Sequence, residues 1–277
     1  MLTLINLNED TGASICIGQH GYGLSEVLVQ KNLENKRVGR IIIALHGNFF
    51  YQSIWTISVL NKKANKCKTL DDIVTTINKA FENFPFRFFG WHIRSQQVPE
   101  EFIKLLGIIA KRQPKVILEI GTAGGGTLFA FAKVACPNAT IISVDLPKGE
   151  FGGGYYPYRI PYYKSFAKFK QKIKLIRADS HSNSTLDRVK KILLGRQLDL
   201  LFIDGDHTYE GVKKDFKMYS GLVKKGGQIA FHDICYHAPE TGCEVHRFWG
   251  EIKKYYPHEE IIKDQKQGWA GIGSIYV

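Results

Sequence analysis

Acidic and histidine side chains gather after two apolar runs in the second half of the chain. Asp204, Asp206 and His207 follow one run within four positions, and His232 and Asp233 end a later run. Carboxylates and histidines beside a ligand pocket suit a divalent metal, a general base, or both. Adjacent parallel strands lie about 4.8 Å apart, so Asp204 and Asp233 can approach a common ion. Asp204, His232 and Asp233 are therefore candidate metal ligands.

The same residues also have purely structural interpretations. Asp206 can cap a helix that begins near Tyr209, and His232 can be a hydrogen-bonded core histidine. Asp204 ends a predicted central strand, where a carboxylate needs a partner because burying it alone is costly. His207 follows Asp204 by three residues and can face the same opening. We take Asp204 and His207 as the candidate catalytic residues, with His207 as a proton acceptor near neutral pH.

A glycine-rich segment, VILEIGTAGGGT at residues 116–127, follows another apolar run. Glycines between a strand and a helix let the backbone approach a ligand closely. The spacing Gly121-x-Ala123-x-x-Gly126 nearly matches a dinucleotide-binding loop. Glu119 argues against that ligand, because a carboxylate there would repel a pyrophosphate. It favours a cation, and S-adenosylmethionine carries both an ammonium and a sulfonium.

Two further acidic residues follow the next predicted strands. Asp145 suits a carboxylate that accepts hydrogen bonds from ribose hydroxyls, a device that NAD enzymes share. Asp179, with Ser180, can reach an adenine amino group, or it can serve as a turn or capping residue. The predicted cofactor-binding set is Glu119, Gly121, Thr122, Ala123, Gly125, Thr127, Asp145, Leu146, Asp179, Ser180 and Asp204.

These motifs resemble those of the class I S-adenosylmethionine-dependent methyltransferases. Glu119-x-Gly121-x-x-x-Gly125 is similar to their first motif, with Ala123 where many members carry another glycine, and Asp145 occupies their acidic ribose position. The resemblance covers roughly residues 80–277. It implies a Rossmann-like, doubly wound α/β fold with a terminal antiparallel hairpin.

The segment LLFIDGDHTYEG at residues 200–211 resembles a narrower branch, the cephalosporin hydroxylase-like proteins and macrolide sugar O-methyltransferases. The resemblance implies that Asp204 and Asp233 bind Mg²⁺ and that His207 is the base. The chain departs from the branch at His232, where the branch has an acid. Because Mg²⁺ prefers oxygen ligands, this departure leaves the identity of the metal, and the need for one, open.

Predicted strands alternate with predicted helices from about residue 70 onward, which indicates a mostly parallel sheet with helices on both faces. Ligands of such sheets bind beyond the carboxyl ends of the strands, where all the candidate residues fall. The predicted strands are Lys115–Ile120, Thr140–Leu146, Lys172–Arg177, Leu198–Asp204 and Gln228–Ile234, with a closing hairpin of Glu259–Asp264 and Gly271–Val277. The predicted helices include Pro99–Lys111, Tyr209–Ser220 and Glu244–Tyr255.

The 277 residues allow one large domain with an extension. We expect an N-terminal extension or cap at residues 1–75 and a methyltransferase domain at residues 76–277. Residues 53–60 are predicted to form a strand or a buried segment, and residues 61–68 a polar surface connection. The chain shows no apolar run of membrane-spanning length and no signal peptide, and its five cysteines show no disulfide or zinc spacing. A cytoplasmic homo-oligomer is expected.

The net charge of +12 is concentrated between Lys148 and Arg177. This stretch can attract nucleic acid or an acidic substrate. Alternatively, it is the solvated face of a helix from Lys164 to Lys174 that turns Phe166, Phe169 and Ile173 inward. No known nucleic-acid-binding motif accompanies the charge, and we favour the helix.

Two segments are candidates for contact with an acceptor molecule. Residues 148–163 combine glycines with tyrosines, including Tyr155 and Tyr156, and suit a mobile lid, or else an ordered loop or subunit contact. Residues 239–247 follow a strand end near the pocket, and Trp269 lies in the predicted hairpin. The leading prediction is O-methylation of a small polyhydroxylated acceptor such as a sugar. The alternatives are an RNA or protein methyltransferase and a non-catalytic protein that binds S-adenosylmethionine.

Overall fold

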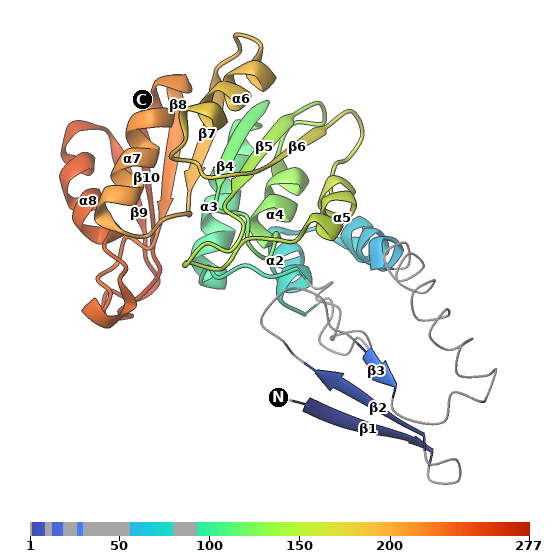
Figure 1. The fold of residues 1–277 in the computed structure, drawn as a ribbon. Coiled ribbons are helices and arrows are strands. Elements are labelled where there is room, and N and C mark those ends of the chain that lie inside the picture. The colour runs from blue at the N-terminus through green and yellow to red at the C-terminus, as the bar shows by residue number, and fades with distance from the viewer. Residues whose placement is uncertain (1, 9–12, 19–26, 30–55, 80–92) are drawn as a thin grey trace. The chain divides into compact units, whose positions relative to one another are not determined.

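The predicted strands form a seven-stranded sheet in a computed structural model that describes residues 2–8, 13–18, 27–29, 56–79 and 93–277. The strand order is β6-β5-β4-β7-β8-β10-β9 (Figure 1). Four neighbouring pairs, from β6 to β8, are parallel, and β10 is antiparallel to both β8 and β9. The mostly parallel sheet with a terminal antiparallel hairpin is therefore confirmed. Its strands are β4 (Val116–Ile120), β5 (Thr140–Asp145), β6 (Lys172–Arg177), β7 (Leu198–Ile203), β8 (Val223–His232), β9 (His258–Ile261) and β10 (Ile272–Tyr276).

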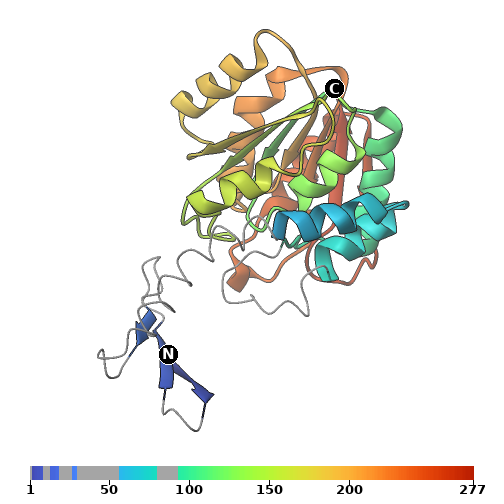
Figure 2. The ribbon, with the colours of Figure 1, turned by 90° about the vertical axis from the view of Figure 1, so that its right-hand side faces the viewer.

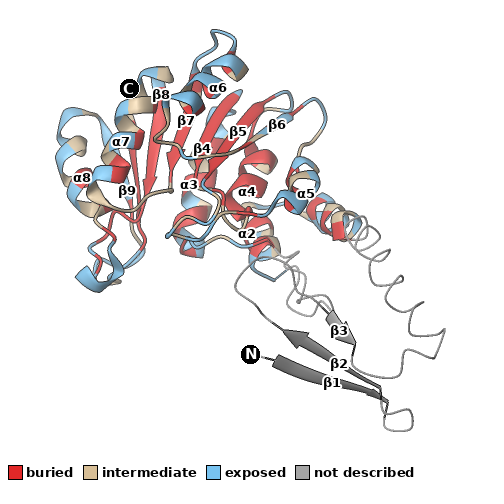
Figure 3. Cartoon of the chain, in the orientation of Figure 1, coloured by how far each residue is buried: buried red, intermediate tan, exposed pale blue. Residues whose placement is uncertain are grey.

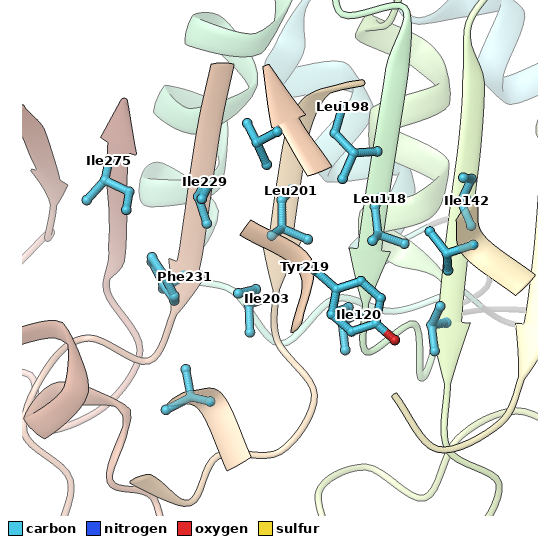
Figure 4. Close-up of a cluster of buried hydrophobic side chains, with 14 of the residues drawn as sticks. Leu118, Ile120, Ile142, Leu198, Leu201, Ile203, Tyr219, Ile229, Phe231 and Ile275 are labelled. Atoms are coloured by element: carbon cyan, nitrogen blue, oxygen red, sulfur yellow. The ribbon is translucent and has the colours of Figure 1, made fainter. Parts of the chain in front are cut away.

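Helices cover both faces of this sheet (Figure 2). One face packs against α6, α7 and α8, whose apolar residues join those of the central strands in a single core. Figure 4 shows strand residues of this core together with Tyr219 of α7. On the other face Phe131 of α4 packs edge-on against Phe202 of β7 and Phe102 of α3. The helices are α2 (Leu70–Lys79), α3 (Pro99–Arg112), α4 (Gly126–Val134), α5 (Ile160–Lys164), α6 (Asn183–Leu193), α7 (Tyr209–Tyr219) and α8 (Val245–Ile252).

The central strands are buried along their whole length, as Figure 3 shows for β4 and β5. Burial on both faces explains why these strands are continuous apolar runs rather than alternating ones. It also means that a polar residue within them needs a special reason. Glu119 in β4 is such a residue, with none of its surface exposed.

The chain divides into two compact units, Met1–Ile54 and Trp55–Val277. The first contains an antiparallel sheet of β1 (Leu2–Asn8), β2 (Ala13–Gly18) and β3 (Val27–Val29). The second unit includes α2, which contacts α3 and α4, and the domain boundary at residue 75 stays a prediction. No helix in the described part of the chain is long and apolar enough to cross a membrane.

Two local predictions are wrong. Residues 56–66 are helical rather than a strand followed by a loop, and Leu60 and Ala64 lie four positions apart on the buried side of that helix. The basic helix predicted from Lys164 to Lys174 does not form. Instead, α5 ends at Lys164, a turn follows, and β6 begins at Lys172. In that turn Phe169 has φ 50° and is 89% exposed, so it does not face inward.

Candidate active site

The register of the parallel strands brings the predicted site residues together. Ile120, the last residue of β4, pairs with Val144 on one side and with Ile203 on the other. Ile203 in turn pairs with Phe231 of β8. Consequently the residues that follow, including Gly121, Asp145, Asp204 and His232, lie at one edge of the sheet, as the strand pattern predicts.

Gly121 is in direct contact with the end of the neighbouring strand. Its φ is 91°, and a β-carbon there would overlap the carbonyl oxygen of Asp204. Gly125 has φ 77°, and a β-carbon there would lie 2.6 Å from the ring of Tyr163. Ala123 also has a positive φ, 37°, which explains why glycine suits this position equally well.

Arg94 completes this loop, although sequence analysis did not single it out. Its backbone nitrogen donates to the carbonyl of Gly124 and its carbonyl accepts from Gly126, at 3.3 and 2.9 Å. The contact is a short parallel bridge between segments some thirty positions apart, and it places Ser95 and Gln97 beside the strand ends. Such a long-range backbone pairing leaves no local pattern that sequence analysis could detect.

Glu119 is a buried carboxylate without a neutralising partner. Neither of its oxygens accepts a hydrogen bond from a residue that the structure describes. Burial raises its pKa to about 8, the nearby Asp145 and Asp204 add to the rise, and the hydroxyls of Thr127 and Thr122 oppose it without being aligned for hydrogen bonds. A cation placed beside Glu119 would favour its ionised form, which fits the predicted ligand.

Asp145 is held mainly by backbone amides. Its carboxylate accepts hydrogen bonds from the amides of Thr122 and Tyr155, at 3.3 and 3.1 Å. Burial nevertheless raises its pKa to about 6. Leu146, the next residue, is 47% exposed. The carboxylate therefore lies between the glycine-rich turn and residue 155, and its contact with a ribose stays a prediction.

Asp179 and Ser180 have the local contacts of a turn. The Asp179 carboxylate accepts from the amide of His181 at 2.8 Å, and the carbonyl of Ser180 accepts from the hydroxyl of Tyr219 at 2.7 Å. These contacts match the turn interpretation of Asp179, and its contact with adenine stays a prediction.

Asp204 connects three side chains from separate segments. Its Oδ1 lies 3.1 Å from Nδ1 of His232 and 3.6 Å from Nε2 of His207. Its Oδ2 accepts a hydrogen bond from Nε2 of Gln97 at 2.9 Å. A carboxylate with these neighbours is both oriented and partly neutralised, which a carboxylate at a central strand end requires.

Asp233 is the second carboxylate of the cluster. Its Oδ2 lies 3.1 Å from Nδ1 of His207 and 3.1 Å from Nδ1 of His232, and its Oδ1 lies 3.2 Å from Nε2 of His237. These three histidines lower the pKa of Asp233, against the effect of burial. Its φ of 62° is strained for a residue other than glycine. His237 was not predicted, because only the turn after β8 brings it back to Asp233.

His207 has carboxylates near both ring nitrogens and an aromatic ring on one face. Phe151 stacks on the imidazole at 4.7 Å between centroids and 12° between planes. Burial opposes protonation of His207, but Asp233, Cys243 and Asp204 outweigh it and raise the pKa to about 10. Asp206 does not share this site. It accepts from the amide and hydroxyl of Thr208, and Thr208 rather than Asp206 is the N-cap of α7.

A cavity of about 630 Å³ opens beside this cluster. His207, His232, Asp233 and His237 form its polar floor. Its other lining residues are Ser95, Gln96, Gln97, Phe151, Gly152, Thr241, Cys243 and Trp269. Thr241 and Cys243 come from the predicted acceptor segment 239–247, and Trp269 from the hairpin.

The loop of residues 148–163, which we predicted to be a lid, lines this cavity with other residues than the expected tyrosines. Phe151 and Gly152 line it, whereas Tyr155 is 3% exposed and its carbonyl accepts from Arg177. Tyr156 is half exposed and stacks on Tyr158 rather than lining the cavity. Tyr155 therefore anchors the loop, and Phe151 is the loop residue whose ring stacks on His207.

Residues 118–234 match the model of a family described as a methyltransferase domain. This part of the chain is a methyltransferase domain. The match includes the glycine-rich turn, Asp145, Asp204, His207, His232 and Asp233, and it confirms that these motifs belong to a methyltransferase domain.

Individual relatives of this methyltransferase are distant or match only in part. An uncharacterized protein of Sinorhizobium fredii is 26% identical over 148 residues, 52% of this chain and 16% of that protein. An uncharacterized protein of Acanthamoeba polyphaga mimivirus is 40% identical over 70 residues, 24% of this chain and 32% of that protein. The chain thus spans about a sixth of the length of the first relative and about a third of the length of the second. An O-methyltransferase from Bacillus cereus, solved in complex with SAH, is 16% identical with a TM-score of 0.49, covering 76% of this chain and 92% of that chain.

Proposed function

We propose that the chain transfers the methyl group of S-adenosylmethionine to a hydroxyl of a small polyhydroxylated acceptor, with His207 as the base. One observation supports this most directly. His207 lines the cavity while both of its ring nitrogens face carboxylates, and the strand end that carries Asp204 touches the glycine-rich turn. Acceptor, base and methyl donor can therefore meet at one edge of the sheet.

The arrangement assigns different tasks to the two nitrogens of His207. In the neutral form of His207, Nδ1 donates its proton to Asp233 at 3.1 Å and Nε2 can accept a proton from the acceptor hydroxyl. Because the neighbouring acids raise the pKa of His207 to about 10, this neutral form becomes more populated as pH rises. The resulting imidazolium is stabilised by Asp233 and Asp204. S-adenosylmethionine supplies an electrophilic methyl group on a sulfonium. The acceptor oxygen forms the new bond to carbon as the carbon–sulfur bond breaks, and the sulfur leaves as a neutral thioether.

Asp204, His232 and Asp233 could together bind a divalent ion, but they match the ligand preference of Mg²⁺ only in part. One donor atom from each lies within 4.8 Å of the others. The two carboxylates suit Mg²⁺, but the imidazole of His232 supplies nitrogen, which Mg²⁺ rarely accepts. Nδ1 of His232 lies 3.1 Å from oxygens of both acids without hydrogen-bond alignment. These three donors therefore suit an imidazole-accepting ion such as Mn²⁺ better than Mg²⁺.

The cavity walls favour an acceptor rich in hydroxyl groups. Oγ of Ser95 and Oε1 of Gln97 are buried, and neither has a hydrogen-bond partner among the described residues. Both residues line the cavity, and a side-chain rotation would expose these oxygens to the hydroxyl donors of a ligand. Phe151 and Trp269 add flat apolar surface for the C–H face of a sugar ring. The lysines at positions 164, 168, 170, 172 and 174 are not among the lining residues, so the charge of that stretch does not point to the acceptor.

Replacing Glu119 with glutamine tests the methyl donor. At pH 7 the Glu119 carboxyl, with its pKa near 8, is mostly protonated in the free protein. Binding of the cationic donor favours ionisation, so wild type should release close to one proton more than Glu119→Gln. Its affinity for the donor should rise as pH increases from 6 toward 8, because the ionised form is then more populated. Titration calorimetry in buffers of different ionisation enthalpy measures both.

The control for this experiment is Glu210→Gln, which changes an exposed carboxylate on α7. The amino group of the donor titrates identically in all three proteins, so differences in proton release report the protein carboxyl. Equal proton release by wild type and Glu119→Gln would refute the role of Glu119. An absence of S-adenosylmethionine binding by the wild type would refute the proposed function itself.

Replacing Trp269 with alanine tests the acceptor. Loss of its indole from the cavity wall should raise KM for a methyl glycoside acceptor roughly three- to tenfold, the size expected for one aromatic contact. The affinity for S-adenosylmethionine should stay unchanged. Transfer of labelled methyl groups to a panel of methyl glycosides measures this, with Tyr255→Ala as a control at another exposed aromatic residue, 78% exposed. Equal KM values for the two variants would argue against a sugar on Trp269.

A further inference from the structure

A thiol lies beside the residues assigned to proton transfer. Cys243 is 6% exposed and lines the cavity together with His207 and Asp233. One donor atom from each of these three residues lies within 4.8 Å of the others, and Nδ1 of His207 lies 3.1 Å from Oδ2 of Asp233. Nitrogen, oxygen and sulfur donors are thus gathered at one point of the cavity wall.

These donors match the ligands of a thiophilic divalent ion. Zn²⁺ is bound by thiolate, imidazole and carboxylate, with Zn–S bonds of about 2.3 Å and Zn–N or Zn–O bonds of about 2.0–2.2 Å. A tetrahedral ion with such bonds holds nitrogen and oxygen ligands about 3.3 Å apart. The observed 3.1 Å between His207 and Asp233 is close to that value. A small movement of the Cys243 side chain would complete three ligands, and the cavity leaves room for a fourth.

The backbone holds the two segments that carry these donors together. The amide of Glu244 donates to the carbonyl of His207 at 2.8 Å. The amide of Cys243 donates to Oγ1 of Thr241 at 3.1 Å. The position of the thiol relative to the imidazole is therefore fixed by hydrogen bonds outside the cluster, as a preorganised site requires.

We propose that His207, Asp233 and Cys243 bind a thiophilic divalent ion of the Zn²⁺ type, and that its binding switches off methyl transfer. The second half of this statement rests on the proposed function of His207. An imidazole that binds a metal through Nδ1 carries its proton on Nε2, so Nε2 has no lone pair for the acceptor proton. The ion also competes with the Asp204–His232–Asp233 set, because Asp233 belongs to both.

Cobalt(II) is the probe for this site, because a cobalt–thiolate bond absorbs in the near ultraviolet and an all-nitrogen or oxygen site does not. Adding Co²⁺ to the wild-type protein should produce this absorption with one equivalent bound. Cys243→Ser should remove it, and Cys136→Ser should keep it, because Cys136 lies near Asn138 and away from the cavity. Circular dichroism verifies that each variant is folded, and His207→Asn should weaken Co²⁺ binding at least tenfold.

Absence of the absorption in wild type, or its persistence in Cys243→Ser, would overturn the site. Methyl transfer with and without Co²⁺ is then compared within each protein. Wild type should lose at least nine-tenths of its rate, and Cys243→Ser should lose a much smaller fraction. If Co²⁺ binds through Cys243 without slowing transfer, the metal site stands and the assignment of His207 as base fails. If the protein does not bind S-adenosylmethionine, the proposed function fails while the optical test remains valid.

Discussion

Gly121→Ala should reduce the affinity for S-adenosylmethionine by at least about 100-fold, equivalent to about 2.7 kcal/mol. The new β-carbon would overlap the backbone carbonyl of Asp204, which no rotation of a side chain can relieve. The φ of 91° adds strain of about 1–3 kcal/mol for any residue with a β-carbon. The turn and the end of β7 must then separate, which displaces the donor site and the Asp204 carboxylate together. Calorimetric titration with S-adenosylmethionine measures the loss.

Gly195→Ala is the matched control, because it separates backbone strain from overlap. Gly195 has φ 79°, similar to that of Gly121, but nothing lies within 4 Å of the position of its β-carbon. Gly195→Ala should therefore lower the free energy of unfolding by about 1 kcal/mol and leave donor affinity unchanged. If the two variants lose the same stability and both bind the donor normally, the close approach of Gly121 to Asp204 does not matter for the site.

The residues that sequence analysis placed correctly are those that end parallel strands. Asp204 is far in the chain from His232 and Asp233, yet their proximity follows from two facts available without a structure. The strands alternate with helices, and such strands end at one edge of the sheet. The preference for a cationic ligand over a dinucleotide rests on a different feature, because Glu119 is a carboxylate in a strand that is otherwise apolar.

The residues that sequence analysis missed depend on contacts between loops. Arg94, Gln97 and His237 reach the site through backbone pairing or a turn, and their own neighbours in sequence show no pattern that indicates it. Phe151 was passed over in favour of the more numerous tyrosines of the same loop. Composition indicated that the loop is amphipathic, but which of its side chains faces the cavity is decided by the fold.

The wrong helix from Lys164 to Lys174 has a different cause. The apolar spacing of Phe166, Phe169 and Ile173 imitates a helical face, but hydrogen bonds of Gln171 stabilise a turn instead. The Gln171 side chain accepts a hydrogen bond from the amide of Lys168. It also donates to the carbonyls of Ala132 and Cys136, at the C-terminal end of α4. A single buried glutamine thus outweighs the helical periodicity, because it satisfies backbone groups that would otherwise lack partners.

His207→Asn should lower kcat roughly 10²- to 10⁴-fold, the usual contribution of a positioned general base. Asparagine can still hydrogen-bond to Asp233 but cannot take up the proton of the acceptor hydroxyl. Because His207 touches the acceptor cavity rather than the glycine-rich turn, the dissociation constant for S-adenosylmethionine should change only a few-fold. Single-turnover methyl transfer, measured with saturating donor, separates the chemical step from binding and product release.

The control is His258→Asn, which changes an exposed histidine on β9 that contacts Trp249 and lies outside the cavity lining. Its kcat should equal that of wild type. The single-turnover rate of wild type should also rise with pH, because the surrounding acids raise the pKa of His207 and only its neutral form accepts a proton. In His207→Asn this pH dependence should disappear along with the rate. A variant that retains both the rate and its pH dependence would show that another group removes the proton, and Asp204, 3.6 Å from the imidazole, would be the next residue to replace.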